Sequence, residues 1–106
     1  MNYRFMRVIV MFDLPVTTPA NLKEYREFRK FLLKSGFIMM QESVYCKLVL
    51  NATVASAVIA LVRKNKPAEG IVQAFLLTEK QFSKIEIITG EYKSDTLDTD
   101  ERLTVL

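Results

Sequence analysis

Short apolar runs alternate with two longer amphipathic stretches along this chain. Residues 8–12 form an unbroken apolar run rich in β-branched side chains, which predicts a strand covered on both faces. The hydroxyl of Thr18 followed by Pro19 marks a helix start, and Gly36 marks a stop. These signals predict a helix over about residues 19–35, with one apolar face and one basic face.

The middle of the chain predicts a hairpin followed by a second helix. Residues 37–40 and 44–50 read as two strands, and the polar break at 41–43 places them as a hairpin. Asn51 is a good cap for a second helix, which the polar cluster at 63–67 ends.

Two further apolar runs complete the pattern. Residues 71–77 predict a fourth strand and the shorter run 85–88 a fifth, before Gly90 closes the globular part. The order β-α-β-β-α-β with one appended strand predicts an α+β, ferredoxin-like fold, with both helices on one face of an antiparallel sheet. The other face would be bare, so we expect a homodimer formed through the sheets.

The end of the chain differs in charge from the rest. Residues 91–106 hold five acidic and two basic side chains and carry −3, whereas residues 1–90 carry +6. We therefore divide the chain into a ferredoxin-like domain, 1–90, and an acidic tail, 91–106. The tail regains strand alternation at its end, which favours docking on a partner's sheet edge or, equally, a frayed terminus. This segment comprises Arg102, Leu103, Thr104, Val105 and Leu106.

Composition excludes several kinds of site. The chain has no histidine, so His-dependent triads and His-containing metal sites are ruled out. Its one cysteine, Cys46, cannot form an internal disulfide, and we expect a buried, inert thiol. Three glycines do not make a phosphate loop. The N-terminus has no extended apolar leader, so we expect a cytoplasmic protein that is not embedded in a membrane.

Asp13 is the single aspartate among residues 1–94, and it stands where a buried strand ends. An aspartate before Leu-Pro is also an ordinary turn former. If the first strands of two protomers meet across a twofold axis, two Asp13 carboxylates would hold Mg²⁺ or Mn²⁺ together with water. Metal-bound water needs no protein nucleophile, so this composition still allows a metal-dependent nuclease.

Basic residues on the first helix are the second candidate site. Their helical spacing places them on one face, which suits phosphate contact, and a solvated charged helix face is the ordinary alternative. The nearby aromatic residues have core spacing, so any binding would be to the nucleic-acid backbone and insensitive to sequence. The candidate phosphate contacts are Lys23, Arg26, Lys30 and Lys34, joined by Arg4 and Arg7 near the first strand.

Four features together resemble one known family. They are the strand end Phe12-Asp13, the helix segment Tyr25-Arg26-Glu27-Phe28-Arg29-Lys30-Phe31-Leu32 closed by Gly36-Phe37, the strand start Gln41-Glu42-Ser43-Val44-Tyr45, and the tail Asp100-Glu101-Arg102-Leu103. The chain resembles CRISPR-associated protein 2, the small non-integrase subunit of the spacer-acquisition complex. The segment Met11-Phe12-Asp13-Leu14-Pro15 looks most like the form in type II systems.

The resemblance implies a ferredoxin-like homodimer that bridges two dimers of the CRISPR-associated protein 1 integrase and holds a short DNA duplex on its basic surface. It makes Arg26 and its basic neighbours DNA contacts, and residues 103–106 the integrase-docking segment. It also implies an alternative, a Mg²⁺-dependent endonuclease on RNA or DNA, CRISPR-associated or toxin-like, with Asp13 as the metal ligand at the dimer interface. A small-molecule-binding regulatory domain is a third reading, and the missing glycine-rich loop counts against it.

Overall fold

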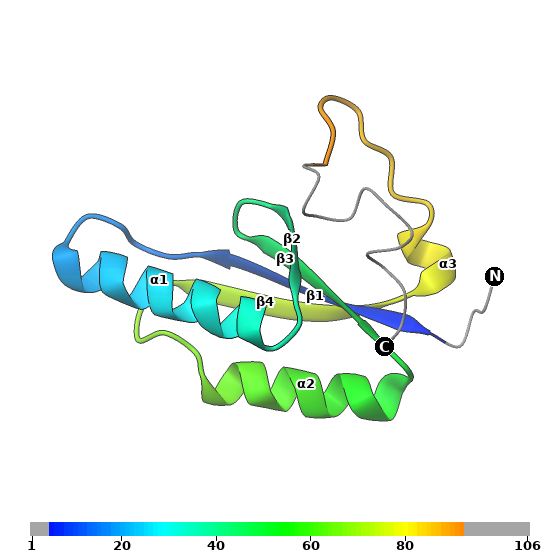
Figure 1. Cartoon of the computed structure of the whole chain (residues 1–106), viewed down its shortest axis with the longest axis horizontal. Helices are drawn as coiled ribbons and strands as arrows, with labels where there is room; N and C mark the ends of the chain where they lie inside the picture. Colours follow the sequence, from blue (N-terminus) through cyan, green and yellow to red (C-terminus); the bar gives the residue numbers. More distant parts are fainter. Residues whose placement is uncertain (1–4, 93–106) are drawn as a thin grey trace.

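The computed structural model describes residues 5–92 and has a four-stranded antiparallel sheet of order β2-β3-β1-β4. Helices α1 and α2 lie together on one face of the sheet (Figure 1). The α+β class and the order β-α-β-β-α-β are confirmed. The elements are β1 (Met6–Asp13), α1 (Pro19–Lys34), β2 (Ile38–Gln41), β3 (Val44–Val49), α2 (Ala52–Lys64), β4 (Ile71–Thr78) and α3 (Glu79–Phe82).

The long helices begin where their caps predict. The Thr18 hydroxyl accepts a hydrogen bond from the Asn21 backbone N–H at 3.0 Å, and the Asn51 side chain accepts one from Val54 N–H at 2.9 Å. These bonds satisfy backbone donors that the first turn of a helix leaves free. At the end of α1, Lys47 Nζ donates to the Ser35 carbonyl at 2.6 Å, which ties the helix to β3.

The core lies between the helices and the sheet, and Phe12 is at its centre. Its ring meets Phe28 edge to face at a centroid distance of 5.2 Å and stacks on Tyr45 at 5.7 Å. Val8 and Val10 point to the same side of β1 because side chains alternate along a strand, and both are fully buried. The alternation leaves residues 7, 9, 11 and 13 on the opposite face of the sheet.

The prediction of a fifth strand over residues 85–88 is wrong for the single chain. A capping box between Thr78 and Gln81 starts α3 immediately after β4 and turns the backbone out of the sheet. Residues 85–88 then have no neighbouring strand within residues 5–92. The side chains of Ile85, Ile87 and Ile88 remain 44%, 49% and 87% exposed.

The sheet face opposite α1 and α2 is bare only in part, which corrects a second expectation. Ile9 and Cys46 are buried there, and Phe82 and Tyr92 pack against them. Toward β4, however, Ile71 is 62% and Phe75 40% exposed. Among the described residues, no strand pairs with the outer edge of β4. Apolar surface and unpaired backbone therefore occur together at β4.

Gly70 allows β4 to begin close beside the end of β1. Its φ of +95° lies in the left-handed region, and a Cβ there would lie 2.6 Å from the Asp13 carbonyl oxygen. That distance is too short for any side chain, and the blocking atom belongs to the backbone. Gly70 therefore fixes how closely β4 approaches the backbone of Asp13.

Replacing Gly70 by alanine should lower the free energy of unfolding by about 2–5 kcal/mol, because strained φ and the contact with the Asp13 carbonyl add together. Gly90 is the matched control, since its φ is +94° and a Cβ added there would meet nothing within 4 Å. Gly90→Ala should cost only about 1–2 kcal/mol. Urea unfolding at one protein concentration measures both, and equal losses would contradict the role given to Gly70.

Candidate nucleic-acid and metal site

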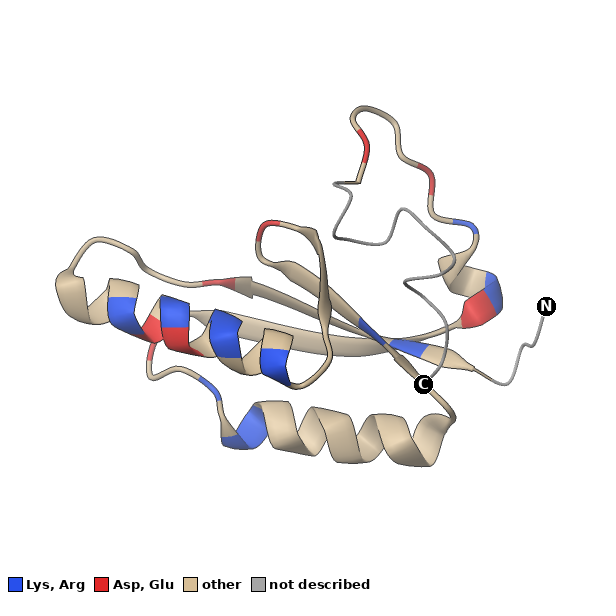
Figure 2. Cartoon of the chain, viewed as in Figure 1, with Lys and Arg blue, Asp and Glu red and all other residues tan. Residues whose placement is uncertain are grey.

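The four basic residues predicted on α1 are all exposed and share the outer side of that helix. Lys23, Arg26, Lys30 and Lys34 follow one another at spacings of three and four residues, so their side chains project in one direction. Figure 2 shows basic positions recurring along the length of α1. The buried residues of this helix, Phe28 and Leu32, lie on its other side, so the basic face is turned away from the core. Arg26, Lys30 and Lys34 also line a shallow depression of about 460 Å³, together with Leu33 and Arg29.

Arg29 is a member of this surface that the sequence did not identify, because its position also fits the apolar stripe of the helix. Its guanidinium lies beside the Tyr45 hydroxyl. Burial raises the pKa of Tyr45, and the charge and hydrogen bond of Arg29 act against that rise. Arg29 therefore lies between the exposed basic face and the core.

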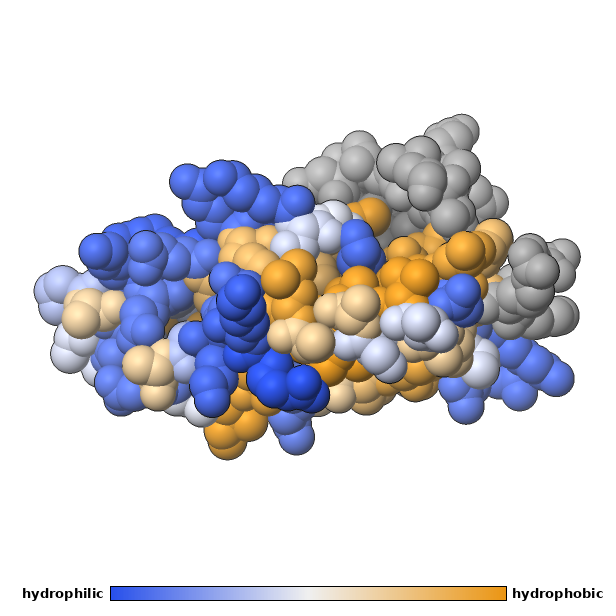
Figure 3. Space-filling model, turned by 90° about the horizontal axis from the view of Figure 1, so that it is seen from below, coloured by the Kyte–Doolittle hydropathy of each residue, from blue (hydrophilic) through white to orange (hydrophobic). Residues whose placement is uncertain are grey.

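A second basic cluster lies at the end of α2. The sequence predicted this segment only as the polar end of the helix. Arg63, Lys64 and Lys66 are exposed there. Figure 3, seen from the α2 side, shows hydrophilic surface at this end of the molecule and apolar surface farther along it.

Arg7 does not belong to the basic surface, which corrects its prediction as a phosphate contact. Its side chain is buried on the sheet face opposite α1 and α2, where Nε and Nη2 donate to the two carboxylate oxygens of Glu79 at 2.7 and 2.9 Å. The guanidinium also lies over the Phe82 ring at 4.2 Å. Burial alone would lower the pKa of Arg7, but the hydrogen bonds and charges of its neighbours raise it. Arg7 thus attaches α3 to the sheet.

Cys46 is buried beside Arg7, as the sequence predicts. Burial raises the pKa of its thiol to about 11, although the nearby Arg7 charge acts in the opposite direction. The thiolate is the nucleophilic form of cysteine, and it is scarce at neutral pH when the pKa is this high. Cys46 is therefore a structural residue and not a candidate nucleophile.

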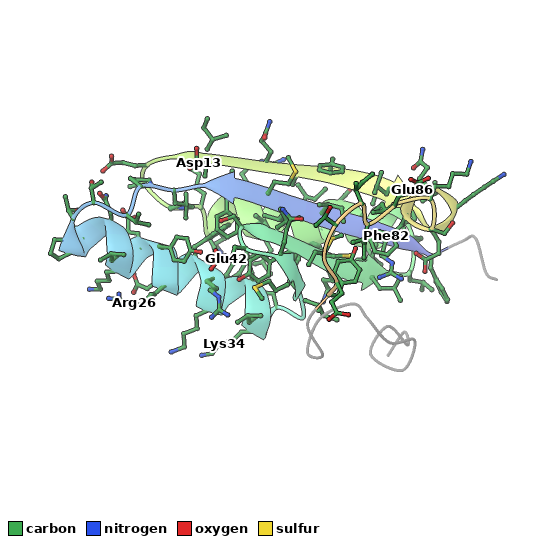
Figure 4. The ribbon with its side chains drawn as sticks, turned by 90° about the horizontal axis from the view of Figure 1, so that it is seen from above. Asp13, Arg26, Lys34, Glu42, Phe82 and Glu86 are labelled. Carbon is green, nitrogen blue, oxygen red and sulfur yellow. The ribbon has the colours of Figure 1, made fainter. Side chains whose placement is uncertain are left out.

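Asp13 is exposed at the end of β1, on the sheet face opposite the helices. Phe12 N–H donates to the Ser43 carbonyl at 3.0 Å, which holds the β2–β3 turn against this end of β1. Ser43 has a φ of 66°, so the turn has a left-handed residue at that point. In Figure 4, Asp13 and Arg26 point to opposite sides of the molecule. The structure does not bring the candidate carboxylate and the basic face together.

The described part of one chain gathers no ready-made set of ligands for a divalent cation. Within residues 5–92 no three acidic or cysteine side chains gather as metal ligands. Glu42 on the β2–β3 turn and Glu86 after α3 lie apart from Asp13 (Figure 4). Mg²⁺ does keep several waters and uses one or two protein carboxylates, so two Asp13 side chains from two chains would be the smallest suitable set.

The remaining predicted site residues lie outside the described part of the chain. These are Arg4 at the start and residues 102–106 at the end. Within residues 5–92, none of the helices has the length and apolar character that a membrane crossing requires.

Replacing Arg7 by alanine should lower the free energy of unfolding by about 2–4 kcal/mol, because the substitution leaves the mostly buried Glu79 carboxylate without its partner. Replacing the exposed Arg26 in the same way should change it by less than about 0.5 kcal/mol. Urea unfolding followed by circular dichroism compares the two variants. Similar stability of both proteins would contradict the structural role of Arg7.

Comparison with known proteins connects this sequence with one family. Residues 6–85 match the family model described as CRISPR associated protein Cas2. A protein of Treponema denticola named CRISPR-associated endoribonuclease Cas2 is 59% identical over 101 residues, covering 95% of this chain and 100% of the relative. A protein of the same name from Streptococcus mutans is 46% identical over 101 residues, covering 95% of this chain and 93% of the relative. The chain therefore belongs to the CRISPR-associated Cas2 family.

Proposed function

We propose that this chain is a homodimeric scaffold of CRISPR spacer acquisition, which binds a captured DNA duplex through its phosphates and bridges dimers of the CRISPR-associated protein 1 integrase. The observation that carries the proposal is the outward basic face of α1, which lies on the other side of the molecule from Asp13. A nucleic acid bound on this face is held in a fixed position, but it does not contact the Asp13 carboxylate of the same chain, which is what a scaffold requires.

The basic face has the properties of a phosphate-binding surface. Four cations from Lys23 to Lys34 extend over roughly 16 Å of helix, at 1.5 Å per residue. Within residues 5–92 the single ion pair is that of Arg7 with Glu79, so the carboxylates described do not neutralise these cations. Lysine and arginine contacts to phosphate are independent of base sequence and release counterions, so binding weakens steeply as salt increases.

The proposed dimer would cover the apolar surface at β4. In our arrangement, residues 85–88 of each protomer add as a strand to the outer edge of the other protomer's β4. That pairing would bury Ile85 and Ile87 and would supply this segment with strand partners that residues 5–92 of its own chain do not offer. Because the exchange is reciprocal, it produces a twofold dimer in which the two α1 faces belong to one particle.

The integrase contact is assigned to the end of the tail, which lies outside the described residues. Its support is the sequence itself, an acidic spacer followed by strand alternation in residues 102–106. In this arrangement the folded domain binds DNA and dimerises, while the tail leads to the enzyme that carries out integration.

Replacing Lys23, Arg26, Lys30 and Lys34 together by alanine should reduce duplex affinity steeply and reduce the slope of log K against log salt by at least about 3. Fluorescence anisotropy with a mixed-sequence duplex, at several salt concentrations, measures both quantities. Lys80→Ala combined with Lys84→Ala is the matched control, because these exposed cations lie on another part of the molecule. An unchanged affinity of the α1 variant would contradict the proposed DNA-binding face.

A Mg²⁺-dependent endonuclease is the second candidate function, and two observations favour it. The relatives with 59% and 46% identity carry the name endoribonuclease. Asp13 also lies on the same sheet face as Ile71, the residue opposite it on β4 and part of the apolar surface that the proposed dimer would cover. A twofold axis near this end of β1 would bring two carboxylates together as hard oxygen ligands.

Replacing Asp13 by asparagine tests this second function, because the amide keeps the shape of the side chain and removes its charge. If Asp13 holds a catalytic cation, Mg²⁺-dependent cleavage of RNA or DNA should fall at least about 100-fold in a matched preparation of the variant. Duplex affinity and dimerisation should stay as they are. Cleavage at the same rate by wild type and variant would assign it to a contaminant or another site.

A further inference from the structure

The cationic cluster at the end of α2 has no assigned role in the proposed function. Arg63, Lys64 and Lys66 are exposed, and no carboxylate lies within ion-pair distance of them in the described part of the chain. Basic residues in the last turn of a helix stabilise its dipole, which accounts for Arg63 and Lys64. Lys66 lies beyond the helix and is not explained in that way.

A furrow lies between α1 and the segment that follows α2, and Lys66 is the member of the cluster that lines it. A depression of about 170 Å³ is lined on the α1 side by Glu24, Glu27, Phe28 and Phe31, and on the other side by residues 65–67. Glu24 also accepts a hydrogen bond from the Ala68 backbone N–H at 3.0 Å, which fixes the turn beside the first half of α1. The basic face of α1 and the cluster of Arg63, Lys64 and Lys66 thus form two cationic ridges. Their relative position is fixed, and acidic and apolar groups lie between them.

The charges of the furrow restrict how a nucleic acid can cross it. A phosphate strand that passed from one ridge to the other would lie over Glu24 and Glu27, where like charges repel. A single strand is therefore expected to follow one ridge. A duplex has two rows of phosphates separated by a groove about 6–12 Å wide, so each row can follow one ridge with the groove above the acidic floor.

We propose that Arg63, Lys64 and Lys66 bind the second strand of a duplex whose first strand lies on α1, so that the two ridges together select duplex over single-stranded nucleic acid. This inference rests on the proposed DNA-binding function. It adds a set of residues and a specificity: the α1 face supplies affinity for any phosphate strand, and the α2 cluster adds affinity for the double-stranded form.

The test uses the full chain, a labelled duplex of about 30 base pairs and one of its strands alone. In Arg63→Gln/Lys64→Gln/Lys66→Gln, duplex affinity near 0.1 M salt should fall on the order of 100-fold, because three phosphate contacts are lost. Affinity for the single strand should change less than about threefold. The variant Lys80→Gln/Lys84→Gln is the control for loss of positive charge elsewhere on the molecule, since it removes two exposed cations on and after α3, and it should bind both probes nearly as wild type does.

A single substitution on the furrow floor tests the duplex selectivity independently, even if the triple variant does not fold. Glu27 is exposed, and Glu27→Gln removes its charge while keeping its size. Single-strand affinity should then rise several-fold, because one strand can contact both ridges. The ratio of duplex affinity to single-strand affinity should fall as a result.

The outcomes separate this inference from the proposed function. If wild-type protein binds neither probe, or if the α1 variant binds as wild type does, the DNA-binding function itself fails. If the α1 variant loses binding while the α2-cluster variant holds the duplex as tightly as wild type, only the second ridge is disproved. Equal loss of duplex and single-strand binding in the α2-cluster variant would likewise overturn the duplex selectivity.

Discussion

Both long helices of this chain pack on one face of a four-stranded sheet, and that arrangement leaves a second apolar face without a layer of its own. The chain covers part of it with α3, which the buried Arg7–Glu79 pair and the Phe82 ring hold against the sheet. Toward β4 this cover ends, and Ile71 and Phe75 remain exposed beside a strand edge that has no partner among residues 5–92. The way in which this exposed apolar surface is buried therefore determines how the chain assembles.

The same division of the sheet separates the two candidate sites of this chain. The basic residues lie on the helical layer, and Asp13 lies at the end of β1 on the opposite face. Pairing across the sheet face opposite α1 and α2 would place two Asp13 carboxylates on the inside of a dimer and the α1 faces on its outside. In such a dimer, the proposed phosphate binding and the proposed metal-dependent cleavage would use different faces, so that loss of one need not affect the other.

Local signals in the sequence were sufficient for most of the fold. Thr18 and Asn51 identify the starts of both long helices because a cap acts on the first turn of its own helix. The basic face of α1 followed from helical spacing alone. Predictions from sequence failed where segments distant along the chain meet. Arg7 precedes its partner Glu79 by 72 residues, so no signal in the neighbouring sequence showed that the Arg7 charge is paired. Residues 85–88 have strand character, but a strand also needs an edge to pair with.

Sedimentation velocity over a wide range of protein concentrations tests the proposed homodimer most directly, because two chains must share the surface at β4. We expect a single species with twice the 12.2 kDa mass of one chain. We also expect Ile87→Asp to shift it toward monomer, since a charge would then enter the covered surface. A wild-type protein that sediments as a monomer at every concentration would contradict the account.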